Sequence, residues 1–142
     1  MPIVTDTGFA PDDLNAGFVP SDDLPANGPF AVDVASDANL APVLARLAEA
    51  TAIRVDFPSS ADGRGFSIAR QLRRAGFAGR LRARGHVLAD QYAMARRSGF
   101  DEVEIDDVLA ARQPEPQWRA RAEWRAHDYQ NRLGRMRDAA TA

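Results

Sequence analysis

The sequence contains no cysteine, no lysine and only two histidines, His86 and His127. Without cysteine, the chain forms no disulfide, no thiolate nucleophile and no cysteine-ligated zinc or iron–sulfur centre of its own. The two histidines lie far apart in the sequence, which argues against a histidine-rich metal site. We therefore predict that the protein binds no metal and no cofactor.

The sequence also lacks an excess of positive charge and any long hydrophobic run. Its formal net charge is −2, so no basic field recruits nucleic acid, and we expect no nucleic-acid partner. No apolar stretch approaches the ~20 residues of a membrane helix. The opening "MPIVTDTGFAPDDL" has neither the basic nor the apolar region of a secretory signal. We expect no membrane partner and a cytoplasmic location.

Proline and small polar residues concentrate at the N-terminus. Residues 1–29 hold five of the nine prolines and many Asp, Asn and Gly residues. This composition predicts an irregular arm with at most one short strand, at Ile3–Val4. Apolar residues recur along the arm, which indicates that it docks onto the rest of the protein. We expect residues 30–142 to form a single α/β domain.

From residue 30 onward, short apolar runs alternate with helical patterns. Strands are predicted at 30–35, 52–57, 80–85 and 102–105. Helices are predicted at 37–50, 65–75, 87–98 and about 118–137, the last being a long C-terminal helix. Strands separated by helices indicate a parallel sheet with right-handed crossovers.

A local repeat supports this phasing. "RRAGFAG" (73–79) and "RRSGFDE" (96–102) each place arginines in the last turn of a helix, where they suit its negative end. Gly76 and Gly99 then fit the left-handed position after the helix, and Phe77 and Phe100 fit the apolar contact that follows. Each unit predicts a helix, a stop and a strand.

The predicted strands each have one apolar and one charged face, because side chains alternate across a strand. The charged faces carry four arginines and five acids, so cross-strand ion pairs would offset much of the charge. These residues are Asp33, Arg54, Asp56, Arg80, Arg82, Arg84, Glu102, Glu104 and Asp106. A doubly wound sheet, by contrast, is apolar on both faces.

The simplest arrangement places every helix on the apolar face. The fold is then α/β, with four βα units, a parallel sheet in chain order and a half-TIM-barrel-like shape. A flavodoxin-like three-layer sandwich is the alternative. A half-barrel leaves two open edges, which would admit a partner, the N-terminal arm, or a second copy by self-association.

The loop "DFPSSADGRGF" (56–66) leaves the second strand at its carboxyl end, where parallel α/β folds bind ligands. Asp62 would cap the next helix, while Gly63 and Gly65 would let backbone amides approach an oxyanion beside the fork of Arg64. The alternative is a loop in which Asp62 caps, the glycines turn and Arg64 is solvated. The loop lacks a complete dinucleotide fingerprint or P-loop.

The third strand ends in "RGHVLADQ" (84–91) at the same edge. Arg84 would join the oxyanion site, and His86 or Asp56 would serve as general acid or base. The alternative for His86 is a backbone-bonded residue at a helix entrance. Asp106 and Asp107 with Asp56 offer carboxylates for a hard cation, but nothing fixes their separation, so we predict no metal site.

Three phrases together resemble a small proteobacterial family of unknown function. They are "DGRGFS" (62–67), "GRLRARGHVLADQ" (79–91) and "RSGFDE" (97–102). Genes of this family lie beside assimilatory sulfite/nitrite reductase and phosphoadenylyl-sulfate reductase, and some members are labelled oxidoreductases. The resemblance marks Arg82, Asp90 and Gln91 as motif residues.

The resemblance implies a pathway, sulfur assimilation, rather than a mechanism. We expect an accessory protein of sulfate or sulfite reduction that binds a partner enzyme, such as sulfite/nitrite reductase, and a small oxyanion. The alternative is a small enzyme acting on a sulfur or phosphate compound, with His86 or Asp56 as acid or base.

Overall fold

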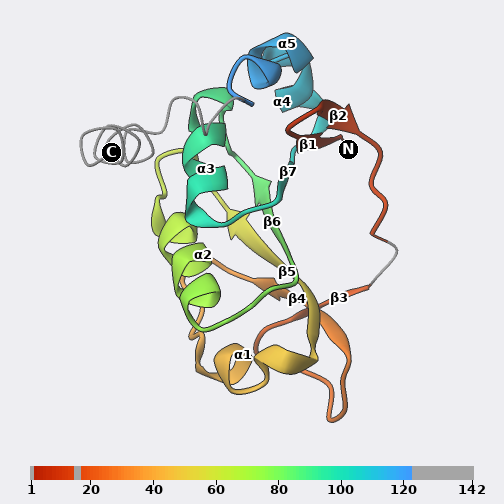
Figure 1. Ribbon diagram of the computed structural model, residues 1–142, viewed down its shortest axis with the longest axis vertical. Coiled ribbons are helices and arrows are strands. Elements are labelled where there is room, and N and C mark those ends of the chain that lie inside the picture. The colour runs from red at the N-terminus through yellow and green to blue at the C-terminus, as the bar shows by residue number, and fades with distance from the viewer. Residues whose placement is uncertain (1, 15–16, 123–142) are drawn as a thin grey trace, which may run out of the picture.

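The computed structural model describes residues 2–14 and 17–122. Its centre is a seven-stranded mixed sheet in the order β2-β1-β7-β6-β5-β4-β3 (Figure 1). The strands are β1 (Ile3–Thr5), β2 (Gly8–Ala10), β3 (Phe18–Pro20), β4 (Phe30–Val34), β5 (Ala50–Phe57), β6 (Arg80–Gly85) and β7 (Glu102–Glu104). The mixed α/β class predicted from the sequence is therefore confirmed.

The four predicted strands form the parallel centre of the sheet. Strands β4 to β7 are neighbours in chain order, and each pair is parallel. The N-terminal segment, predicted to be largely irregular, supplies the other three strands. β3 pairs with β4 in parallel, while the hairpin of β1 and β2 pairs antiparallel with β7. The open edges of the parallel sheet thus take up strands from the N-terminal arm.

Two predicted helices match the structure and end as the repeat predicts. Helix α2 spans Arg64–Arg74, and α3 spans Tyr92–Ser98 after a 3-10 turn, η2, at Ala89–Gln91. Gly76 and Gly99 have positive φ angles of 104° and 118°. The next residue in each case is buried and donates its N–H five positions back, from Phe77 to the Leu72 carbonyl and from Phe100 to the Ala95 carbonyl. Both helices therefore end in a Schellman motif.

The helix predicted at 37–50 is shorter and broken. It consists of α1 (Ala41–Ala45) and a 3-10 turn, η1 (Leu47–Glu49). Pro42 lies in the first turn of α1, a position that favours a helix start there. Arg46, between the two turns, leaves the helical conformation and donates to the Pro25 carbonyl at 2.6 Å and to Glu49 at 2.8 Å. These contacts with the N-terminal segment replace continuation of the helix.

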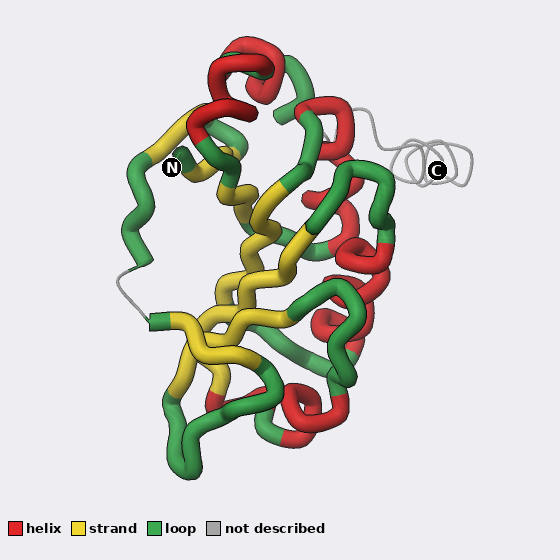
Figure 2. Tube along the Cα trace, turned by 180° about the vertical axis from the view of Figure 1, so that it is seen from behind, coloured by secondary structure: helices red, strands yellow, loops and turns green. Residues whose placement is uncertain are grey.

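Helices α1, α2 and α3 cover one face of the sheet, and the N-terminal segment crosses the other side (Figures 1 and 2). The apolar strand side chains and the buried positions of α2 and α3 form one core between these layers. The flavodoxin-like alternative requires helices on both faces, which is not the arrangement of α1 to α3. The half-barrel description stays a prediction, because the described sheet carries three further strands at its edges.

Two short helices close the end of the sheet beside the N-terminal hairpin. They are α4 (Asp107–Arg112) and α5 (Glu115–Arg119). Trp118 on α5 is 1 % exposed and donates its indole N–H to the Gln113 carbonyl at 2.7 Å. Glu115 accepts the Phe9 N–H at 2.8 Å, which ties α5 to β2. The helix predicted at 118–137 is wrong in its described part, because α5 begins at Glu115 and ends at Arg119, and residues 120–122 are not helical. The rest of that prediction, from residue 123, lies outside the described residues.

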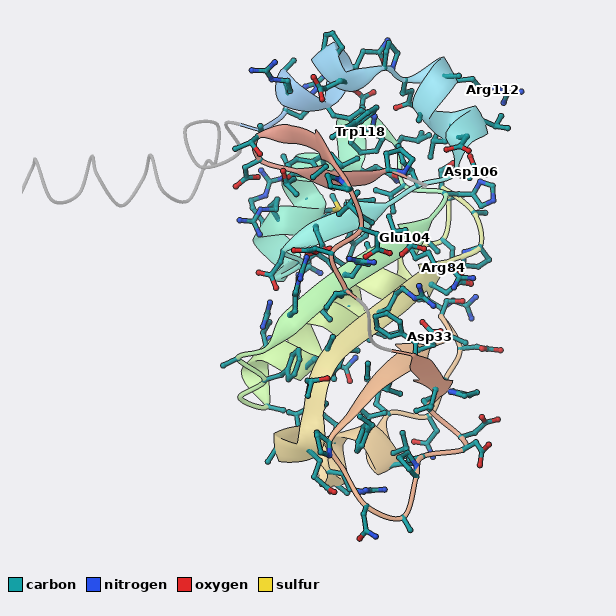
Figure 3. The ribbon with its side chains drawn as sticks, turned by 90° about the vertical axis from the view of Figure 1, so that its right-hand side faces the viewer. Asp33, Arg84, Glu104, Asp106, Arg112 and Trp118 are labelled. Carbon is teal, nitrogen blue, oxygen red and sulfur yellow. The ribbon has the colours of Figure 1, made fainter. Side chains whose placement is uncertain are left out.

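The polar face of the sheet carries a network of arginines and carboxylates (Figure 3). Arg54 donates to the two oxygens of Asp33 at 2.6 and 2.8 Å and to Glu104 at 3.2 Å. Arg82 donates to Glu102 and Glu104 at 2.8 Å each. These bonds join β4, β5, β6 and β7 across the face, so the cross-strand pairing predicted from the charge pattern is present.

The N-terminal segment buries the middle of this network. Asp12 accepts two hydrogen bonds from Arg82 at 3.0 and 3.1 Å, and Asp13 accepts one from Arg80. Arg82 is only 1 % exposed, and its two partners on β7 are also buried. A buried charge costs several kcal/mol of desolvation unless it is paired, so the fold depends on the full set of Arg82 contacts.

The burial of Arg82 generates a stability prediction. Replacing it in Arg82→Met leaves the carboxylates of Glu102 and Glu104 buried with fewer partners. We expect the free energy of unfolding in urea to fall by about 3–5 kcal/mol. Arg97→Met changes an exposed arginine on α3 and should alter it by less than about 0.5 kcal/mol. A loss below about 1 kcal/mol in Arg82→Met would contradict the assigned role.

Candidate functional site

A cleft lies at the carboxyl edge of the parallel strands. It has a volume of about 720 Å³ and opens where β4, β5 and β6 end. Ligands of open parallel sheets bind at this edge. Its lining combines apolar walls with charged groups: Pro20, Ser21, Asp22, Asp33, Val34, Ala35, Asp37, Ala38, Asn39, Pro42, Arg54, Asp56 and Arg84.

A second, smaller cleft of about 320 Å³ adjoins the first. It is lined by Asp56, Phe57, Pro58, Arg84, Gly85, His86 and Asp106. Asp56 and Arg84 therefore line both clefts. The structure brings together at one edge the residues that the sequence singled out as candidate acid–base groups, Asp56 and His86, and one arginine of the predicted oxyanion site.

Asp56 and Arg84 differ from the other charged residues of the polar face. In the part of the chain that the structure describes, neither has a hydrogen-bond or ion-pair partner, whereas Arg54, Arg80 and Arg82 each bind carboxylates. Asp56 and Arg84 are register partners on β5 and β6. Both are partly buried, so their charges face the clefts with incomplete hydration.

The reason for the unpaired guanidinium lies on the neighbouring strand. Glu104 is the register partner of Arg84 on β7. Its Oε1 instead accepts from Arg82 at 2.8 Å and from Arg54 at 3.2 Å. The carboxylate that would pair with Arg84 is thus bound by two other arginines. Figure 3 shows Arg84 and Glu104 on the same face of the sheet.

A glycine turn presents His86 at the smaller cleft. Gly85 has a φ of +115°, and a Cβ added there would lie 2.5 Å from the Phe57 carbonyl oxygen. That carbonyl accepts the His86 N–H at 2.9 Å, and the His86 side chain is exposed. The backbone contact matches the structural alternative for His86, while its place beside Asp56 also suits the acid–base one.

The loop at 56–66 is closed by its own residues. Arg64 donates to both oxygens of Asp62, at 2.9 Å from Nε and 2.7 Å from Nη2, and Asp62 also accepts the Arg64 N–H at 3.1 Å. This pairing holds the pKa of Asp62 well below its ordinary value. The second contact of Nη2 is Ser36 Oγ at 3.1 Å. Asp62 and Ser36 therefore engage Nε and Nη2 of Arg64.

The two loop glycines have different surroundings. Gly65 is buried, and an added Cβ would lie 2.4 Å from the Phe57 ring, so this glycine lets α2 approach β5. Gly63 is exposed, with nothing within 4 Å of an added Cβ.

Arg64 lines a hollow with Ser36 and with residues of α1 and α2. This hollow shares Asp37, Ala38 and Asn39 with the larger cleft, but Arg64 does not line either cleft that contains Asp56 and Arg84. The N-cap of α2 is Gly63, without a side-chain cap hydrogen bond, and Asp62 binds Arg64 instead. The loop therefore differs from the predicted alternative in which Asp62 caps the helix and Arg64 is solvated.

The motif residues have structural partners. Gln91 accepts the Leu88 N–H at 2.9 Å and donates to the Ser60 carbonyl at 2.8 Å, which links the loops that follow β5 and β6. Asp90 pairs with Arg121 at 3.0 Å, and Arg82 is the buried centre of the ionic network. Of the three, Gln91 joins the loops at the carboxyl edge of the sheet.

The described residues lack the arrangements of side chains that hold metal ions. They contain no group of three or more His, Asp or Glu side chains placed to hold an ion. Asp106 instead caps α4 by accepting the Leu109 N–H at 2.7 Å. A helix long and apolar enough to cross a membrane is likewise not found among residues 2–14 and 17–122.

Sequence reasoning missed one wall of the larger cleft. Pro20, Ser21 and Asp22 come from the end of β3 and the turn after it. They lie in the segment predicted to be an irregular arm, so no strand end was expected there. The signal available was the run of Pro, Ser and Asp at 20–23, which is typical of a turn.

The left-handed turn at the clefts generates a second prediction. Gly85→Ala would place a side chain at positive φ against the Phe57 carbonyl. We expect a loss of about 1–3 kcal/mol in the free energy of unfolding, with changed amide shifts at Phe57 and His86. Gly63→Ala, where φ is −85° and space is open, should cost less than about 1 kcal/mol. Equal losses in the two variants would contradict this account.

Comparison with known proteins identifies the family. Residues 31–139 match the family described as a bacterial protein of unknown function, DUF934. Searches of curated proteins and of solved structures found no match. The match covers most of the chain, including β4 to β7 and the clefts at their carboxyl ends. This chain therefore belongs to the DUF934 family of bacterial proteins.

Proposed function

We propose that this protein is a cytoplasmic accessory protein of sulfate or sulfite reduction, and that it recognises its partner enzyme through the carboxyl edge of the sheet. The family resemblance described above suggests the pathway. The observation that carries the binding role is the pair of uncommitted charges, Asp56 and Arg84, which line both clefts beside a network that is otherwise paired.

Unpaired charges at a cleft cost stability, because partial burial weakens their hydration. A partner that supplies opposite charges would offset this loss of hydration when it binds. The fixed register of β5 and β6 sets the positions of the two charges and so makes the interaction specific. Arg84 is also the member of the predicted oxyanion site whose guanidinium is open to a ligand, since Arg64 is held by Asp62. The oxyanion role is therefore centred on Arg84.

Self-association is the other partner relation that the sequence suggested. The sheet ends in β2 and β3, which are three residues long each, and β3 ends in Pro20. Short edges with proline are poor templates for strand pairing. These edges favour a different enzyme as the partner over a second copy.

Partner binding is tested by affinity capture from a native cytoplasmic extract of the source bacterium, followed by mass spectrometry. The wild type should recover sulfite/nitrite reductase or another sulfur-assimilation enzyme, and Arg84→Ala should recover at least about tenfold less, since an interfacial charge pair is lost. Arg70→Ala, an exposed arginine on α2, is the matched control and should behave as wild type. Recovery of no such enzyme by the wild type would refute the proposal.

A small enzyme is the second candidate, favoured by one observation. Asp56, Arg84 and His86 line a single cleft, which places a base, a cation and a histidine around one volume of about 320 Å³. His86 there would transfer a proton to or from a sulfur or phosphate compound bound at Arg84.

The enzyme alternative makes its own prediction. The isolated protein should turn over a sulfur or phosphate ester, and His86→Ala should lower kcat by about 10²-fold or more without changing the unfolding midpoint, because the side chain is exposed. The assay is release of sulfate, sulfite or phosphate from a panel of such esters. Absence of turnover by the wild type, together with capture of a partner, would decide for the accessory role.

A further inference from the structure

The two unpaired charges on neighbouring strands form a matched recognition pair. Asp56 and Arg84 are in register on β5 and β6, so their side chains emerge on the same face. They form no ion pair with each other, although both line the larger cleft. A guanidinium donates hydrogen bonds to an oxyanion, and a carboxylate accepts hydrogen bonds from an ammonium group. The pair is therefore complementary to a ligand that carries an oxyanion and an ammonium group.

The larger cleft continues from this pair into apolar walls. The apolar residues of its lining are Pro20, Ala35, Ala38, Pro42 and the fully buried Val34. Its volume of about 720 Å³ falls in the range of small-molecule sites, which combine apolar walls with a few polar groups that fix orientation. The charged pair would orient the ligand, and the walls would receive its side chain.

The remaining charges of the cleft narrow the ligand class. Asp33 is bound by Arg54, while Asp22 and Asp37 add negative charge to the rim. These carboxylates weaken the attraction of Arg84 for an anion in the larger cleft, so a ligand that also carries a positive charge would bind there more tightly than an oxyanion alone. A ligand that carries an ammonium group would be favoured, whether its side chain is apolar or basic.

We propose that the larger cleft binds a free α-amino acid with an apolar or basic side chain, with its carboxylate on Arg84 and its ammonium group on Asp56. The inference rests on the assignment of the carboxyl edge as the recognition site. It goes beyond the proposed function, because it names a small molecule that would bind the isolated protein without the partner enzyme.

The test is a titration of the full-length isotope-labelled protein, followed by two-dimensional ¹H–¹⁵N NMR. The probes are L-leucine and L-arginine, each with its N-acetyl form, which lacks the ammonium group, and its amide, which lacks the carboxylate. We expect at least one free amino acid to give saturable shifts at Ala35, Ala38, Asp56 and Arg84. Both of its derivatives should bind about tenfold or more weakly, because each loses a charge-assisted contact.

Matched variants assign the contacts. Arg84→Gln and Asp56→Asn should each weaken binding of the free amino acid about tenfold or more, and Arg70→Gln should leave it unchanged. The same spectra report whether each variant is folded. Equal binding of the N-acetyl form or of the amide would overturn the proposal, as would the absence of saturable shifts with both amino acids. Neither result would affect partner capture, so failure here is distinguishable from failure of the accessory role.

Discussion

The buried guanidinium of Arg82 is the constraint on which the structure depends. It lies on the central strand β6 and donates hydrogen bonds to Glu102 and Glu104 of β7. Asp12 of the N-terminal segment covers it and accepts two further hydrogen bonds. Because a buried cation must be fully paired, this one side chain fixes the register of two strands and the path of the arm across the polar face. Arg82 also binds Glu104, the register partner of Arg84, so Arg84 has no carboxylate partner among the described residues and its guanidinium can bind a ligand at the clefts.

Local sequence patterns predicted the centre of the fold well. The strands β4 to β7, the helices α2 and α3 and the two glycine stops follow from alternation and from capping chemistry, which act over a few residues. Of the three N-terminal strands, only β1 was anticipated, as the short strand at Ile3–Val4. β2 and β3 were not predicted, because each is three residues long and is defined by pairing with a neighbouring strand rather than by its own pattern. The break at Arg46 has the same origin, since its cause is a contact with Pro25.

The candidate site was predicted only in part, because some of its features follow from local sequence patterns and others depend on contacts between distant residues. The carboxyl edge follows from the order of strands and helices, and Asp56, Arg84 and His86 were found from their position at strand ends. The ion pair of Arg64 with Asp62 was not among the alternatives for the loop, because it depends on side-chain geometry that the sequence does not fix. The availability of Arg84 was beyond sequence reasoning, because it depends on which of several arginines Glu104 binds.

The antiparallel pairing of β1 with β7 has a consequence for how the chain reaches this structure. Ile3 pairs with Glu104, about a hundred residues later. During synthesis, the first strand emerges from the ribosome long before its partner exists, and the edge of the sheet closes only when nearly all of the described chain is available. Such distant contacts slow folding, so the hairpin of β1 and β2 lacks its β7 partner while the parallel centre assembles.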